Sequence, residues 1–201
     1  MALDSRVTNH NFANTAEDPQ IAADLPQDTA NGQLLYAIER GTYFIKLNGD
    51  VRAPACASIE EFINAMFADS QLQSVLIDVS EATGLDSTTL GLLAKISLKS
   101  QSTLKHYPTL VSANSDISKI LASMGFEQVF NLIEKNKTCS SALAEIPKVD
   151  CCASQLCEQI LDAHKTLMTL NENNRITFKS LVEALEVEVL EVDTSPKEDK
   201  N

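Results

Sequence analysis

Apolar residues follow two different patterns along the first two thirds of the chain. Short apolar runs, several of them rich in β-branched residues, predict β-strands. These runs are residues 32–40, 42–47, 75–79, 109–111 and 129–133. Between the runs, apolar residues recur at helical spacing, and the predicted helices cover residues 58–67, 88–104 and 115–124. Because strands alternate with helices, we predict an α/β domain with a mixed sheet of about four to five strands packed by helices.

Local signals predict turns and helix ends within this domain. The break at Gly41 between the first two apolar runs predicts a β-hairpin. Ser58 and Glu61 have the spacing of a capping box, so we expect them to cap the first helix. Asn114 is a favourable capping residue for the third helix, and Gly125 suits the position just after its end.

A second helical pattern follows the α/β domain. After a polar linker at residues 134–149, apolar residues repeat at 4-3 spacing, then an Asn-rich break precedes Thr177. We expect Thr177 to cap a second helix, so that residues 150–192 form an antiparallel helical hairpin. The stretch 185–192 also alternates like a strand. The apolar faces of the hairpin need cover, either from the chain's own core or from a homodimer or another partner, and the sequence leaves both open.

Composition and charge narrow the classes of function. The 201 residues include 28 acidic and 16 basic ones, a net charge of -12, while the 44% hydrophobic share is enough for a packed core. Much of the acidity lies outside residues 32–133, partly in an N-terminal arm at residues 1–31 that we expect to be mobile. We expect residues 193–201 to be a disordered tail. This charge disfavours nucleic acid and anionic membranes as partners.

The chain also lacks signals for membrane insertion or export. No apolar run approaches the roughly 18 residues needed to span a bilayer. The first residues have neither a basic region nor an apolar segment typical of a signal peptide. We therefore expect a cytoplasmic protein whose five cysteines are free thiols.

The loop between the strand at 75–79 and the helix at 88–104 is the main candidate site. It follows the carboxyl end of a central strand, where open α/β sheets place their functional sites. Asp86 and Ser87 lie in this loop, but by spacing alone the favoured interpretation is that one of them only caps the helix. The residues around them carry more information.

The string Leu76-Ile77-Asp78-Val79-Ser80, followed by Gly84-Leu85-Asp86-Ser87-Thr88-Thr89-Leu90-Gly91, resembles the signature of the STAS domain. This name covers sulphate transporters and anti-sigma factor antagonists. In the soluble antagonists the signature reads Asp-Leu-Ser, a short gap, then Asp-Ser-Ser/Thr-Gly-Leu-Gly. The resemblance covers about residues 32–133, half of the chain. It departs at Thr89, where the family usually has Gly, and at Arg52, where antagonists often carry an acid.

The resemblance implies a cytosolic anti-sigma factor antagonist that regulates transcription, for instance in a stress response. An anti-sigma factor with serine-kinase activity would phosphorylate Ser87, with Thr88 as the alternative, and a serine/threonine phosphatase would reverse the mark. The unphosphorylated form would bind the anti-sigma factor through Asp86, Ser87, Thr88, Gly84 and Asp50, and so free a sigma factor. It implies no catalytic residues and no cofactor. We expect the Ser87 hydroxyl to be exposed near free backbone amides.

Other functions stay open at this point. The chain could be a STAS subunit of an ABC-type lipid transport complex, or a signalling or biofilm regulator without a sigma factor. Cys151, Cys152, Cys157 and His164 are the candidate ligands for a metal site. Cys157 and His164 lie two turns apart on one helical face, but the cysteines lack zinc-site spacing. We therefore expect no metal, and interpret the cysteines as small buried residues of an amphipathic helix.

Overall fold

The computed structural model describes residues 32–134 and 142–194. The expected N-terminal arm and most of the expected tail lie outside these ranges. Within them, six strands form one mixed sheet in the spatial order β5-β4-β3-β2-β1-β6. The strands are β1 (Gln33–Glu39), β2 (Thr42–Val51), β3 (Ser74–Leu85), β4 (Thr109–Val111), β5 (Asn131–Ile133) and β6 (Ala144–Glu145).

The pairing confirms a mixed α/β sheet. β1 and β2 form the expected antiparallel hairpin, whose turn residues Arg40 and Gly41 both have positive φ. The pairs β2–β3, β3–β4 and β4–β5 are parallel. The sheet has one strand more than the sequence indicated, because β6 pairs antiparallel with β1. This strand comes from the stretch 134–149, which we expected to be a linker, and Ile146 beside it is buried.

The helices lie close to their expected positions, with differences at their starts. They are α1 (Cys56–Ala68), α2 (Ser87–Leu104), α3 (Ser115–Ser123), α4 (Ala153–Leu170) and α5 (Glu172–Thr194), with short 3-10 turns at Ala53–Ala55 and Phe126–Gln128. The capping box at Ser58 is wrong, because the first 3-10 turn leads directly into α1 before Ser58. The Ser58 hydroxyl instead accepts a hydrogen bond from the Val149 amide at 2.9 Å.

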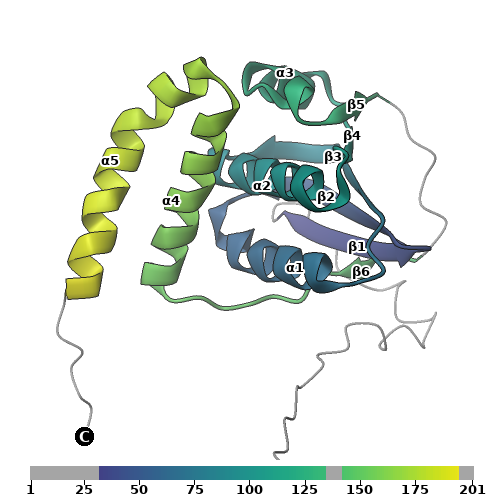
Figure 1. Ribbon diagram of the computed structural model, residues 1–201, viewed down its shortest axis with the longest axis horizontal. Helices are drawn as coiled ribbons and strands as arrows, with labels where there is room; N and C mark the ends of the chain where they lie inside the picture. The colour runs from purple at the N-terminus through teal and green to yellow at the C-terminus, as the bar shows by residue number, and fades with distance from the viewer. Residues whose placement is uncertain (1–31, 135–141, 195–201) are drawn as a thin grey trace, which may run out of the picture.

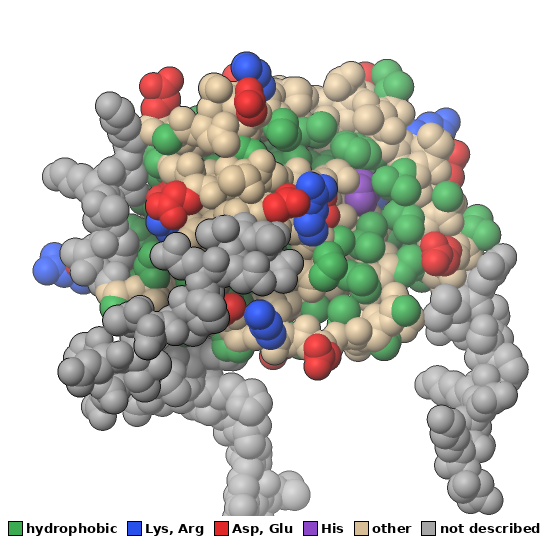
Figure 2. Space-filling model, turned by 180° about the vertical axis from the view of Figure 1, so that it is seen from behind, with side chains coloured by type: hydrophobic (Ala, Val, Ile, Leu, Met, Phe, Trp, Pro, Cys, Tyr) green, Lys and Arg blue, Asp and Glu red, His purple; other side chains and the backbone are tan. Residues whose placement is uncertain are grey.

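One face of the sheet carries the core. Tyr43, Ile45 and Leu47 alternate on β2 with less buried residues, and Val75, Ile77 and Val79 do the same on β3. Helices α1 and α2 lie over this face (Figure 1). The molecule is seen from the opposite side in Figure 2, where hydrophobic side chains gather in several groups with acidic and basic side chains between them.

Helices α4 and α5 form an antiparallel hairpin beside α1 and α2 (Figure 1). We call residues 153–194 the C-terminal hairpin. The chain's own core covers α4, since Leu161, Ala163 and Leu167 are buried and Leu167 belongs to the main hydrophobic cluster. On α5, Phe178 and Val182 are also buried. Of the two kinds of cover that the sequence left open, the chain's own core is the one that α4 uses.

The break between the two helices is shorter than the sequence indicated. α5 begins at Glu172 and not at Thr177, because the Asn171 side chain accepts a hydrogen bond from the Asn174 amide at 2.8 Å. The buried Asn174 side chain donates to the Met124 and Leu167 carbonyls at 2.9 and 3.0 Å, which fixes the turn to the domain. The strand alternative for residues 185–192 is wrong, since α5 continues to Thr194.

Candidate functional site

The candidate site lies where β3 ends and α2 begins. Asp86 is the residue that caps α2, and its carboxylate accepts hydrogen bonds from the Thr89 amide at 2.8 Å and the Ala53 amide at 2.6 Å. The first bond satisfies a free amide of the first helical turn. The second ties the start of α2 to the connection between β2 and α1. Asp86 therefore fixes the geometry of the site, whatever else it contacts.

The hydroxyl of Ser87, the first residue of α2, is held by a residue from the C-terminal hairpin. Its Oγ lies 2.8 Å from Nε2 of His164, which is 2% exposed. The other ring nitrogen, Nδ1, lies 2.8 Å from the Ile160 carbonyl, which can only accept. In the neutral ring Nδ1 therefore carries the proton, and Nε2 accepts a hydrogen bond from the Ser87 hydroxyl. The hydroxyl is less exposed than we expected, because Ser87 is half-buried and bonded to α4.

A serine bonded to the Nε2 atom of a histidine is also an arrangement that can activate a nucleophile. In this pair the histidine is oriented by a carbonyl of its own helix and not by a carboxylate. The ring packs edge to face on Phe178, with the ring centroids 5.2 Å apart. The pair therefore holds the hydroxyl in one orientation and covers it with a buried ring.

The other predicted site residues lie at the same end of the sheet. Asp50 pairs with Gly84 across the β2–β3 ladder, and a side chain at Gly84 would collide with the Asp50 carboxylate. Asp50 also accepts from the Nε atom of Arg52 at 2.7 Å. This hydrogen bond raises the pKa of Arg52 further, with the charge of Asp50 adding to the effect. Thr88 is only 4% exposed, so Ser87 is the more accessible hydroxyl of the two.

Thr89 and Gly91, two residues of the signature, face the interior and α4 respectively. Thr89, which replaces the usual glycine, is fully buried, and its hydroxyl donates to the Val51 carbonyl at 3.3 Å. It therefore faces the domain interior. The close backbone approach occurs instead at Gly91, where an added Cβ would come within 3.0 Å of the backbone of Ala163 on α4. Glycine at this position allows α4 to lie directly against α2.

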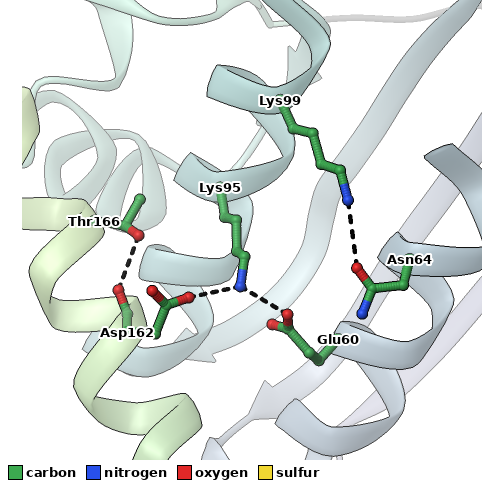
Figure 3. A network of polar contacts seen from close by, with 6 residues as sticks. All are labelled: Glu60, Asn64, Lys95, Lys99, Asp162 and Thr166. Carbon is green, nitrogen blue, oxygen red and sulfur yellow. Dashed lines mark hydrogen bonds and ion pairs between the residues drawn. The ribbon is translucent and has the colours of Figure 1, made fainter. Parts of the chain in front are cut away.

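A charged cluster beside the site joins three helices (Figure 3). The ammonium group of Lys95 on α2 donates to Glu60 on α1 at 2.7 Å and to Asp162 on α4 at 2.6 Å. Burial alone would lower the pKa of Lys95, but the hydrogen bonds to Asp162 and Glu60 outweigh it and raise the pKa. Nearby, Lys99 donates to Asn64 at 3.3 Å. The cluster therefore fastens α4 to the domain at a second point.

Sequence analysis considered His164 only as a metal ligand, rejected that role, and did not connect this residue with Ser87. Both ring nitrogens are engaged, with Ser87 and Ile160, and no group of three metal-binding side chains occurs among the described residues. Cys151 and Cys157 are half-exposed and Cys152 is exposed, so they are not the buried residues we expected. A polar histidine within the apolar stripe of α4 was the signal that pointed to a polar contact. Its partner, 77 positions away, could not be inferred from spacing.

Comparisons with known proteins agree with this description. Residues 34–140 match the model of the STAS domain family. This range ends before the C-terminal hairpin. No curated protein matches the chain. In the portion of the chain that the structure describes, no helix has the length and apolar character to span a bilayer.

Several solved structures resemble part of the chain at low sequence identity. An anti-sigma factor antagonist from Mycobacterium paratuberculosis is 21% identical with a TM-score of 0.46, over 52% of this chain and 86% of that one. The protein TM1081 is 19% identical with a TM-score of 0.43, over 49% and 78% of the two chains. The phosphorylated form of the Bacillus cell fate determinant SpoIIAA is 16% identical with a TM-score of 0.43, over 52% and 92%.

Proposed function

Because the chain belongs to the STAS domain family, we propose that it is a cytoplasmic anti-sigma factor antagonist. It is a binding module and not an enzyme. Its unphosphorylated form binds an anti-sigma factor with serine-kinase activity and thereby frees a sigma factor. Phosphorylation of Ser87 ends this binding, and a serine/threonine phosphatase restores it. The observation that carries the proposal is the position of the Ser87 hydroxyl on the first residue of α2, at the carboxyl end of β3.

The local charges explain how a phosphate would act as a switch. A phosphoryl group adds a charge of about -1.5 to -2. The start of α2 favours an anion by roughly 0.3–1 kcal/mol, so the α/β domain keeps its fold. In a partner interface that fits a hydroxyl, an unpaired buried charge costs several kcal/mol. The loss in the interface is the larger effect, so phosphorylation releases the partner.

Affinity capture with four forms of the protein tests this function. Wild type, Ser87→Ala and Ser87→Asp serve as baits in extracts of the native cell, and Thr83→Asp, an added acid on the exposed end of β3, is the matched control. We expect Ser87→Ala and Thr83→Asp to retain an ATPase of the histidine-kinase type that Ser87→Asp loses. The purified ATPase should then transfer phosphate from ATP to Ser87 of the wild type, as phosphopeptide mapping would show.

Two results would contradict the proposed function. Retention of a transport ATPase and its permease by all the baits would identify a structural STAS subunit of a transport complex. Phosphate found on another residue, with Ser87→Asp binding as tightly as wild type, would remove Ser87 from the switch.

A further inference from the structure

One stripe of α2 is covered by three consecutive residues of α4. Ser87, Gly91 and Lys95 lie four residues apart and therefore share a face of the helix. His164 bonds Ser87, the backbone of Ala163 lies against Gly91, and Asp162 bonds Lys95. We call residues 87, 91 and 95 the α2 stripe. A partner that binds at the Ser87 end of this stripe meets α4 already in place.

The docked helix places the His164 ring directly against the Ser87 hydroxyl. A phosphoryl group places a phosphorus and three oxygens beyond Oγ. In the docked form Oγ is 2.8 Å from the His164 ring, which is itself buried against Phe178. The phosphate and the docked His164 therefore compete for the same volume.

Electrostatics act in the same direction. Residues 153–194 contain eight acidic side chains and three basic ones. Lys95, the cationic residue of the α2 stripe, is already paired with Asp162 and Glu60. A charge of about -1.5 to -2 added at Ser87 therefore gains no unpaired cation from the α2 stripe. The same charge is favoured by the start of α2 once α4 has moved away.

We propose that the C-terminal hairpin is an intramolecular ligand of the α2 stripe, docked when Ser87 is unmodified and expelled when Ser87 is phosphorylated. The hairpin therefore competes with the anti-sigma factor for the same face. A kinase must displace α4 before it reaches the hydroxyl. This proposal rests on the proposed function in two respects, namely that Ser87 is the residue that is modified and that the anti-sigma factor binds this face.

Hydrogen exchange of the full chain, with phosphoserine installed at position 87 during translation, tests the proposal without a kinase or a partner. We expect amides of α4 and α5 to exchange about tenfold faster or more than in the unmodified protein, while β2 and β3 keep their protection. Phosphoserine at Ser102, which is exposed on the last turn of α2, is the matched control and should leave α4 protected. Gly91→Ala should open α4 to a similar extent without any added charge.

Two outcomes would overturn the proposal. Unchanged protection of α4 in the phosphoserine-87 protein would mean that His164 accommodates the phosphate, for example as a protonated donor. An equal loss of protection in β2 and β3 would mean that the hairpin and the domain unfold as one unit. Failure to find an anti-sigma factor would refute the proposed function but would not alter these exchange rates, so the two failures are distinguishable.

Discussion

Replacing Lys95 with methionine tests how firmly α4 is held to the domain. The substitution keeps an unbranched apolar side chain of similar length but removes the ammonium group that donates to Glu60 and Asp162. It leaves two carboxylates facing one another across α1 and α4 (Figure 3). The hydrogen bond between Ser87 and His164 is untouched, so the effect isolates the charged cluster.

The size of the expected loss of stability follows from the exposure of Lys95 and its two partners. The side chains of Lys95, Glu60 and Asp162 are 28%, 18% and 53% exposed. A pair with an exposed carboxylate such as Asp162 contributes about 0.5 kcal/mol. The more buried pair with Glu60 contributes about 1.5–2 kcal/mol, because a hydrogen bond to a charged group is lost and the carboxylate stays partly desolvated. We therefore expect Lys95→Met to lower the free energy of unfolding by about 2–2.5 kcal/mol.

Urea unfolding and hydrogen exchange of α4 provide the assay. Asp162→Asn should cost about 0.5 kcal/mol and Glu60→Gln about 1–2 kcal/mol, and Lys99→Met is the control for loss of a lysine on the same helix. A cost below about 0.5 kcal/mol for Lys95→Met, or an equal cost for Asp162→Asn, would refute the assignment of most of the energy to Glu60.

The difference in the free energy of unfolding between wild type and Lys95→Met should depend on pH with a defined sign. The pKa of Lys95 is raised in the folded protein, so its stabilisation is fully present below the unfolded pKa of about 10.4. It is lost as the pH rises through the folded pKa. The stability difference between wild type and Lys95→Met should therefore be constant near neutral pH and shrink above about pH 10.5.

Three further changes have expected outcomes. Deleting residues 150–201 should leave the α/β domain folded but several kcal/mol less stable and more prone to associate, because apolar residues of α1 and α2 lose their cover. Circular dichroism would measure the stability and sedimentation the association. Loss of cooperative melting would contradict this expectation. Tyr43→Phe removes a 2.7 Å hydrogen bond to Asp69 and should cost about 1 kcal/mol. The Gln71 amide and the Tyr43 hydroxyl hold the pKa of Asp69 below its usual value, so the substitution should raise that pKa in an NMR titration, and the stability difference should shrink as the pH falls below about 4. Asp86→Ala loses both amide bonds and should cost about 2–3 kcal/mol in urea unfolding, while Asp86→Asn should cost less; equal costs would show that the carboxylate charge matters more than the number of bonds.

Local patterns predicted most of the α/β domain correctly. The strand at 109–111 matches β4, Asn114 caps α3 through its side chain, and Gly125 has the positive φ expected after a helix end. These features depend on residues close in sequence, whose side chains bond their own backbone or alternate across one sheet. The family signature likewise lies within one strand and one helix start, and it placed Ser87 next to the start of α2; the expected loop is shorter than predicted, because β3 continues to Leu85 and α2 begins at Ser87.

Features that depend on distant contacts were missed. The short strand β6 has only two residues and forms because β1 offers a free edge, which no local pattern indicates. Thr177 resembled a cap, but the contacts of Asn174 with Met124 and Leu167 place the turn earlier. The bond between Ser87 and His164 joins residues 77 positions apart. The amphipathic pattern of residues 153–170 predicted a helix, but not the surface on which it packs.

A phosphate on Ser87 has two effects, because it displaces α4 and adds a charge to the binding face. The Gly91→Ala variant separates these two effects. If the hairpin covers the binding face, the apparent dissociation constant for the anti-sigma factor equals the intrinsic constant divided by the fraction of open molecules. Gly91→Ala should raise this fraction without adding charge, since its Cβ meets the backbone of Ala163. We therefore expect Gly91→Ala to bind the anti-sigma factor more tightly, by the same factor as its α4 amides exchange faster, until the open form predominates. Phosphoserine at position 87 opens α4 equally but should abolish binding, because its charge stays in the interface. Faster exchange in Gly91→Ala without tighter binding would show that the partner binds elsewhere than the α2 stripe.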